Sequence, residues 1–226
     1  MDVTQTPLSG TETVFVGLAV AAVVVPSATW ELVQHFSVMA HEGMHGAVGS
    51  VSGRRVKSIT LASNGEGETI IAARPGPGSL MAAFTGYLGP SAFGLGAARL
   101  IQFGHIIVVL WLAMLLLVLL FAALKTRSFA YVIVPLAAFL IFLVLKHTPQ
   151  TGQILASYAI TWFLLLSGVR TVVADGVGAG DADILNGKTS IPQVVWFLLW
   201  LALTLAVAAI GARWMLHPVI PLAAHR

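Results

Sequence analysis

Two histidines and a glutamate form the pattern in this chain with the clearest chemistry. His41 and His45 lie four residues apart, and Glu42 directly follows the first histidine. Positions i and i+4 share one face of a helix, so both imidazoles can reach one tetrahedral Zn²⁺. Glu42 can then take a proton from an attacking water and pass it to a leaving amine. The HExxH pattern therefore predicts a zinc hydrolase, whereas the plainer interpretation is a polar patch that holds water at a helix interface.

A zinc site of this kind needs a third protein ligand and keeps a fourth position for water. The chain has no cysteine, which leaves His, Asp, Glu or Asn as ligands. One of the four aspartates, Asp2, lies in the N-terminal tail, and the others cluster at Asp175, Asp181 and Asp183. We expect membrane topology to bring this cluster toward the histidines. Asp181 is the favoured ligand, with Asp183 and Asp175 as alternatives, and an aspartate is expected to cap a short helix that begins near residue 181.

The composition places these residues in a membrane. Hydrophobic residues make up 58% of the chain and charged residues only 9%, against about 25% charged residues in soluble domains. The net charge of +3 and the absence of any basic run longer than Arg54–Arg55 argue against nucleic-acid binding. The first 13 residues contain Asp2 and Glu12 but no Lys or Arg, so they do not resemble a signal peptide.

Seven apolar segments are candidates for membrane helices, which need about 20 residues to cross the hydrocarbon core. They cover residues 14–25, 30–51, 79–101, 105–124, 129–145, 153–173 and 192–215. The first segment is short and ends at Pro26, which disfavours helix at the preceding residue. The sequence therefore predicts one all-α polytopic membrane domain over residues 1–226, with seven transmembrane helices or six.

A β-hairpin is expected at about residues 54–74, between the second and third apolar segments. Residues 54–61 alternate polar and apolar side chains, residues 63–67 form a turn cluster, and residues 68–73 read as a second strand. The Pro/Gly run that begins at Arg74 ends this strand. The hairpin either offers an unpaired edge to which an extended substrate adds as a strand, or it is a short amphipathic hairpin at the level of the lipid headgroups.

Lys and Arg residues set the expected orientation, because they concentrate on the cytoplasmic side of a membrane protein. With seven spans, eight of the 12 fall on one side: Arg54, Arg55, Lys57, Arg74, Lys125, Arg127, Arg170 and Lys188. The other side receives Arg99, Lys146, Arg213 and Arg226. The metal site would then lie toward the cytoplasm. Six spans would move only the N-terminus to the outer side.

The chain resembles the site-2 protease family of intramembrane metalloproteases, most closely a short bacterial branch without soluble domains. The resemblance rests on residues 39–48 around the HExxH motif, the hairpin, residues 84–90 (FTGYLGP), residues 180–183 and residues 189–192. It implies that His41 and His45 bind zinc and that Glu42 is catalytic. Larger members carry the third ligand in a Leu-Asp-Gly segment. The most similar segment in this chain is Asp175–Gly176, which follows Ala174 instead of a leucine. In the short branch the matching segment is Ser-Asp-Ala, and here Gly180 precedes Asp181.

The resemblance predicts an endopeptidase that cuts transmembrane segments of other proteins, within a bacterial plasma membrane. The expected partners are a transmembrane substrate, bound by strand addition to the hairpin, and the lipid bilayer. An Asn-Pro segment of the larger family members is absent, and Gly89-Pro90-Ser91 is expected in that space. Two other functions fit the same residues: a metal-ion or proton transporter, and a protease-like scaffold that binds membrane proteins without cleaving them.

Overall fold

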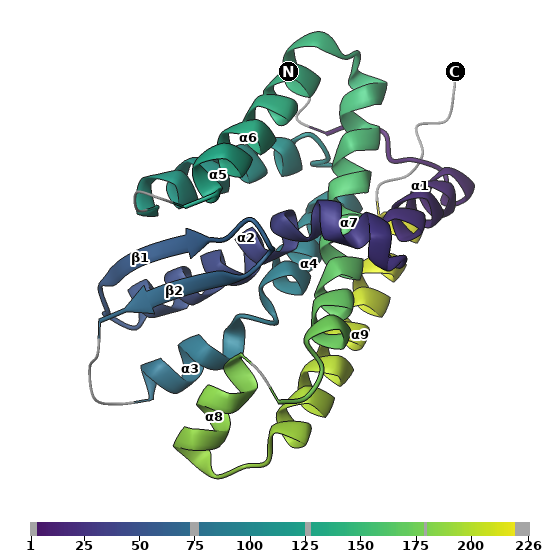
Figure 1. Cartoon of the computed structure of the whole chain (residues 1–226). Helices are drawn as coiled ribbons and strands as arrows, with labels where there is room; N and C mark the ends of the chain where they lie inside the picture. Colours follow the sequence, from purple (N-terminus) through teal and green to yellow (C-terminus); the bar gives the residue numbers. More distant parts are fainter. Residues whose placement is uncertain (1–3, 73–76, 125–127, 179, 220–226) are drawn as a thin grey trace, which may run out of the picture.

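The computed structural model describes residues 4–72, 77–124, 128–178 and 180–219, and within these ranges it contains nine helices and one two-stranded sheet (Figure 1). The elements are α1 Gly10–Val24, α2 Ser27–Val51, β1 Val56–Leu61, β2 Gly67–Ile71, α3 Gly78–Thr85, α4 Gly89–Gln102, α5 Val108–Ala123, α6 Ala130–His147, α7 Gln150–Asp175, α8 Asp181–Thr189 and α9 Gln193–Leu216. The predicted helical fold and hairpin are confirmed. Five residues used in the predictions lie outside the described ranges: Asp2, Arg74, Lys125, Arg127 and Arg226.

Within the described ranges, three helices are long and apolar enough to cross a membrane, namely α6, α7 and α9. A fourth span is possible if α1 and α2 count together, although they meet at an angle of 103°. The six or seven spans expected from the sequence are not confirmed. Pro26 is the N-cap of α2 and separates the first two apolar segments. The third segment divides into α3 and α4, and α5 is a shorter apolar helix.

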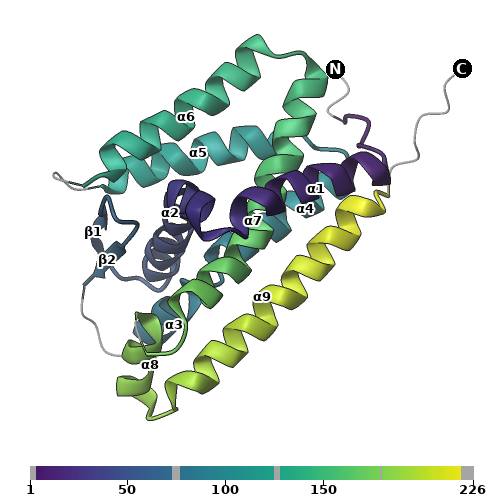
Figure 2. The same ribbon diagram turned by 45° about the vertical axis from the view of Figure 1, so that its right-hand side comes forward.

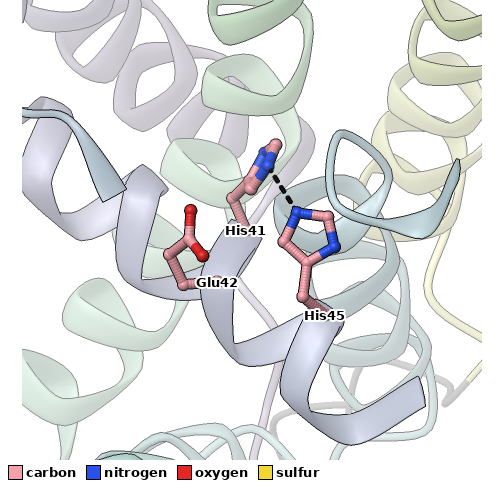
Figure 3. Close-up of side chains that lie close together, drawn as sticks. All are labelled: His41, Glu42 and His45. Carbon is pink, nitrogen blue, oxygen red and sulfur yellow. Dashed lines mark hydrogen bonds between the residues drawn. The ribbon is translucent and has the colours of Figure 1, made fainter. Parts of the chain in front are cut away.

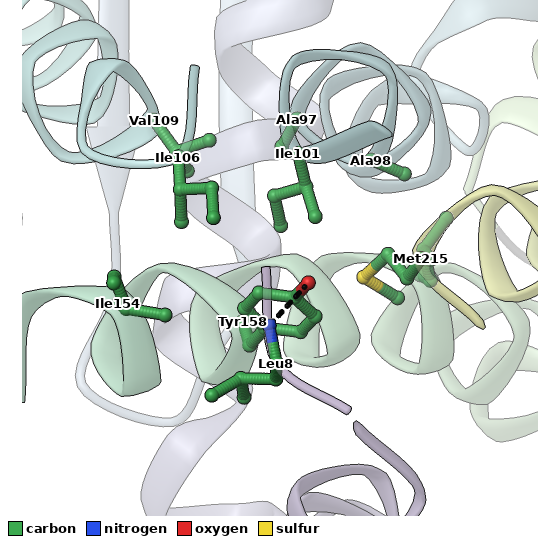
Figure 4. Close-up of a cluster of buried hydrophobic side chains, with 10 residues drawn as sticks. Leu8, Ala97, Ala98, Ile101, Ile106, Val109, Ile154, Tyr158 and Met215 are labelled. Carbon is green, nitrogen blue, oxygen red and sulfur yellow. Dashed lines mark hydrogen bonds between the residues drawn. The ribbon is translucent and has the colours of Figure 1, made fainter. Parts of the chain in front are cut away.

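Helices α4, α7 and α9 pack against one another, with α7 through the middle of the fold and α9 along one side, and α1 packs against α7 (Figure 2). A buried cluster at one end of these helices surrounds Tyr158 (Figure 4). Its hydroxyl accepts a hydrogen bond of 3.2 Å from the backbone N–H of Leu8. Glycines allow the helices to approach closely: a Cβ at Gly94 would lie 2.9 Å from the backbone nitrogen of Leu165, and one at Gly211 would lie 2.7 Å from the Leu165 side chain.

The hairpin lies along α2, the helix that carries the HExxH motif (Figure 1). Strands β1 and β2 are antiparallel. Small residues of α2 allow this contact, because a Cβ at Gly49 would lie 2.8 Å from Ile71 and one at Gly46 would lie 3.2 Å from Ile59. The second strand ends at Ile71 rather than at residue 73, and the predicted end of the hairpin at residue 74 lies outside the described residues.

The two edges of the sheet differ. The outer edge of β1 is covered, because Ile59 forms a bridge with Leu124 and the carbonyl of Leu61 accepts a hydrogen bond of 2.9 Å from Phe129. Among the described residues, no third strand pairs with β2. Backbone groups alternate in direction along a strand, and Ala72 donates to Arg55 beside β1. The backbone N–H and C=O groups of Gly67, Thr69 and Ile71 in β2 therefore point away from β1.

Candidate metal centre

His41, Glu42 and His45 all project from α2 in the arrangement that their spacing predicted. The Nε2 atoms of the two histidines lie 3.0 Å apart, and a dashed line marks this contact in Figure 3. One potential ligand atom from each of the three residues lies within 4.8 Å of the others. Glu42 is 4% exposed, and its Oε2 atom is buried with no hydrogen-bond partner among the described residues. This buried group of nitrogen and oxygen atoms has the composition of a metal site.

Asp181 completes a triangle of ligand atoms. It is the first residue of α8, and its Oδ2 atom lies 3.2 Å from Nε2 of His41 and 3.2 Å from Nε2 of His45. Two ligands of a tetrahedral zinc ion, each at ~2.0–2.1 Å, lie ~3.3 Å from one another. The three atoms are thus spaced closely enough to share one ion of this kind.

The other two candidate aspartates lie in different environments. The Oδ2 atom of Asp175 accepts a hydrogen bond of 2.8 Å from the Tyr87 hydroxyl. The Oδ1 atom of Asp183 accepts one of 2.9 Å from the side-chain amide of Gln193, at the exposed start of α9. Of the three described aspartates, Asp181 is the one within ion-pair distance of the histidines. The tertiary structure therefore distinguishes Asp181 from the other two aspartates, which the sequence could only rank behind it as candidate metal ligands.

The predicted aspartate cap of α8 is wrong, because the N-cap is Gly180. Its backbone has φ 61° and ψ −137°, a conformation that is strongly disfavoured for every residue except glycine. Gly180 therefore turns the chain so that Asp181 enters the first turn of α8 with its carboxylate toward the histidines. This conformation gives a physical reason for glycine immediately before the aspartate.

Charge and hydrogen bonding prepare the group for a cation. The Nδ1 atom of His45 lies 2.7 Å from the carbonyl oxygen of Ala82. Because a carbonyl only accepts hydrogen bonds, Nδ1 carries a hydrogen, so the neutral form of the ring has its lone pair on Nε2, where it can bind a metal. Burial raises the pKa of Asp181, but contacts with His41 and His45 outweigh burial and lower the pKa to about 2. The Asp181 Oδ2 atom is buried without hydrogen-bond geometry to either ring, so a bound cation would satisfy it.

Gly86 leaves the space that such a cation needs. A Cβ atom at this position would lie 2.6 Å from Nε2 of His41 and would also overlap the imidazole of His45. Gly86 has ordinary right-handed helical angles, φ −53° and ψ −58°, so the requirement for glycine comes from space and not from conformation. The segment between α3 and α4 thus forms one wall of the candidate centre.

The centre opens into a cleft of about 1570 Å³. The hairpin lines one part of this cleft, and residues of α2, α3, α7 and α8 line most of the rest. The hairpin lies close to Glu42, because a Cβ at Gly67 would be 2.6 Å from its Oε1 atom. The Thr69 hydroxyl also donates to the backbone carbonyl of Glu42 over 3.1 Å. The edge of β2 and the motif therefore border the same cleft.

Sequence reasoning missed the residues that hold α3 against the centre. Two carbonyls in the last turn of α3 would lack helical partners. His45 satisfies the carbonyl of Ala82, and the indole N–H of Trp200 donates to the carbonyl of Phe84 over 2.8 Å. Tyr87 packs on the same tryptophan, with ring centroids 4.5 Å apart. The segment FTGYLGP carries part of the family resemblance, and the small residues Ala82 and Gly86 predict close helix packing. Their spacing does not indicate that the partners of this segment are α2 and α9.

None of the curated proteins and none of the solved structures compared with the chain matches it. A protein-family model does match, and its match extends over residues 14–211. This region contains the HExxH motif, the hairpin, the α3–α4 junction and Asp181. The chain therefore belongs to the Peptidase M50B-like family, a site-2 protease family.

Proposed function

We propose that this protein is an intramembrane zinc endopeptidase that hydrolyses peptide bonds in transmembrane segments of other proteins. The observation that carries the proposal is the triangle of His41, His45 and Asp181 atoms, with edges of 3.0 to 3.2 Å, next to the buried carboxylate of Glu42. These three residues would hold the ion, and Glu42 would act as the general base. Zinc supplies a Lewis acid that polarises a carbonyl and makes water more acidic.

Glu42 has the surroundings of a proton carrier. It is buried, its Oε2 atom has no hydrogen-bond partner within the described part of the chain, and it lines the cleft. A carboxylate in this state is free to accept a proton from the attacking water and to deliver it to the leaving amide nitrogen. The hydrogen bond from Thr69 holds the backbone of Glu42, not its carboxylate, so the carboxylate is left for this role.

The proposed substrate adds to the free edge of β2 as an extended strand. A transmembrane helix must unwind before its backbone can reach the metal, because a helix keeps its peptide groups in internal hydrogen bonds. The outward backbone groups of Gly67, Thr69 and Ile71 can bind such a strand. Gly67 lies beside Glu42, so a strand held at this edge passes the general base.

The apolar helices and the family identify an integral membrane protein. Beyond this, we propose a multi-pass protein of a bacterial plasma membrane with six or seven spans and with the metal centre toward the cytoplasm. The support for this orientation is the distribution of Lys and Arg along the sequence. For the chain to cross the membrane six or seven times, shorter apolar helices such as α5 would also have to span it.

The test is a Glu42→Gln variant, with zinc content and cleavage of single-span reporter proteins both measured in proteoliposomes. We expect zinc to be retained and the cleavage rate to fall by about 10²–10⁴-fold, the usual contribution of a general base. Glu31→Gln is the control, since Glu31 is exposed on the same helix and should leave both quantities unchanged.

The same experiment separates the alternative functions. Unchanged cleavage by the Glu42→Gln variant would contradict the assigned role of Glu42. If the wild-type protein binds reporters without cutting any of them, the scaffold function is favoured. If it drives Zn²⁺ or proton flux that Glu42→Gln abolishes, the transporter function is favoured.

A further inference from the structure

Tyr87 occupies a position for which the proposed chemistry has no role so far. It follows Gly86 in the segment between α3 and α4, and it is 5% exposed. Its ring meets the imidazole of His41 edge to face, with centroids 4.8 Å apart and an interplanar angle of 87°. On another side the ring packs on Trp200. Tyr87 thus fills the space between a proposed metal ligand and α9.

The Tyr87 hydroxyl reaches the segment that carries Asp181. It donates a hydrogen bond of 2.8 Å to Oδ2 of Asp175, the last residue of α7. A Cβ at Gly180, immediately before Asp181, would lie 3.1 Å from the same hydroxyl oxygen. One side chain therefore touches His41 and both ends of the connection from α7 to α8.

The described residues between α7 and α8 include three glycines. Gly176, Gly178 and Gly180 all have positive φ angles. Glycine has more backbone freedom to lose on ordering than any other residue. An external anchor at the end of α7 reduces the number of positions available to Asp181, and the Tyr87–Asp175 hydrogen bond is such an anchor.

We propose that Tyr87 and Asp175 are positioning residues that preorganise the metal ligands. The ring of Tyr87 supports His41, and the hydrogen bond to Asp175 holds the start of the segment that ends in Asp181. This inference rests on the proposed function, because it requires that His41, His45 and Asp181 bind the metal. Removing groups that orient metal ligands typically weakens metal binding by ~10–100-fold.

The test compares metal binding by Tyr87→Phe, Asp175→Leu and Asp175→Asn with the full-length wild-type protein in detergent. The zinc dissociation constant is measured by competition with a chromophoric chelator, and the visible spectrum of the Co²⁺-loaded protein reports on ligand geometry. Tyr87→Phe and Asp175→Leu should each weaken zinc binding by ~10-fold or more and alter the Co²⁺ spectrum. Asp175→Asn keeps an oxygen that can accept from Tyr87, and it should restore both properties to near the wild-type values.

Tyr158→Phe is the matched control for loss of a buried hydroxyl. Tyr158 is fully buried among α4, α7 and α9, and its hydroxyl is bonded to Leu8 at a distance from the cleft residues. We expect Tyr158→Phe to lower the thermal unfolding midpoint without changing the zinc dissociation constant or the Co²⁺ spectrum. A change in metal binding that is specific to Tyr87 cannot then come from a general loss of stability.

Three results would contradict the inference or the proposed function. Wild-type metal binding by Tyr87→Phe would overturn the inference while leaving the proposed function intact. If Asp175→Asn binds zinc as weakly as Asp175→Leu, the charge of Asp175 is required and its positioning role is overturned. If the wild-type protein binds no zinc, the proposed function fails, and the inference fails with it.

Discussion

Gly86 lies so close to His45 that no side chain fits between them. The backbone of the α3–α4 junction thus forms part of the candidate metal centre, although this junction contributes no ligand atom. Helix α3, which precedes this junction, contacts α2 through the 2.7 Å hydrogen bond between the His45 ring and the carbonyl of Ala82. Helix α3 therefore sets both the orientation of one imidazole and the empty volume beside it.

Gly86→Ala should weaken metal binding without unfolding the protein. The added Cβ would overlap the His45 ring and lie 2.6 Å from Nε2 of His41, so the ligands must move apart. We expect zinc affinity to fall by more than ~10-fold, since misplaced ligands cost at least as much as lost outer partners. Zinc content and the unfolding midpoint would be measured together.

Gly96→Ala is the control for this variant, because Gly96 lies in α4 and a Cβ there would meet nothing within 4 Å. It should bind zinc normally and be slightly more stable, by ~0.5–1 kcal/mol, as is usual when alanine replaces glycine in a helix. Normal zinc binding by Gly86→Ala would show that the space beside the histidines is not needed for the ion.

Asp181→Asn should weaken zinc binding by at least ~100-fold, because the variant loses an anionic ligand and not merely a group that orients one. Asp183→Asn is a closely matched comparison two residues along α8. Its carboxylate contacts the exposed Gln193 amide, so we expect wild-type zinc binding and a stability change within ~0.5 kcal/mol. Equilibrium dialysis with Zn²⁺ distinguishes the two variants. Equal loss of zinc in both would contradict the assignment of Asp181 as the third ligand.

Zinc should stabilise the folded protein by an amount that rises with the logarithm of the free zinc concentration once this exceeds the dissociation constant. At a free zinc concentration 100 times the dissociation constant, one site adds ~2.7 kcal/mol to the free energy of unfolding. We expect a chelator to lower the thermal unfolding midpoint of the wild-type protein and added Zn²⁺ to restore it. His45→Ala should show neither effect, while His147→Ala, at the exposed end of α6, should behave as the wild type. A zinc-dependent shift that survives in His45→Ala would place the ion elsewhere.

Strand addition at β2 can be tested by disulfide cross-linking, because the chain contains no cysteine of its own. A Glu68→Cys, Glu42→Gln double variant places one thiol in the cleft and, if Glu42 has the proposed role, should prevent cleavage. Cross-links to cysteines scanned along a reporter segment should recur at every second residue, since side chains alternate along a strand. Cross-links at every third or fourth residue would indicate a bound helix instead. Lys57→Cys on β1 is exposed but does not line the cleft, and it should give no such pattern.

The spacing of neighbouring residues was sufficient to predict part of this site. The four-residue separation of His41 and His45 determines a shared helical face, and the structure places both on α2 with Nε2 atoms 3.0 Å apart. The alternation of residues 54–61 and the turn that follows likewise predicted the hairpin. These features depend on a few neighbouring residues, which is why the sequence alone reveals them.

The number of membrane spans could not be predicted from the lengths of the apolar segments alone. Residues 79–101 form one continuous apolar segment in the sequence. In the structure the helix is interrupted between α3 and α4, at the junction where Gly86 packs against the histidines. Pro26 similarly separates α1 from α2 at an angle of 103°. Hydropathy measures the transfer of side chains into lipid, and it does not register contacts that redirect a helix inside the protein.

The sequence by itself determined the HExxH helix, the apolar character and the shortlist of Asp175, Asp181 and Asp183. Only the tertiary structure decided which of these aspartates faces the histidines, because that depends on how Gly180 turns the chain and how α8 packs against α3 and α9. The contributions of Gly86 and Tyr87 also appear only in three dimensions. Helical spacing acts over one turn, whereas a metal centre is assembled by segments that meet through long-range packing.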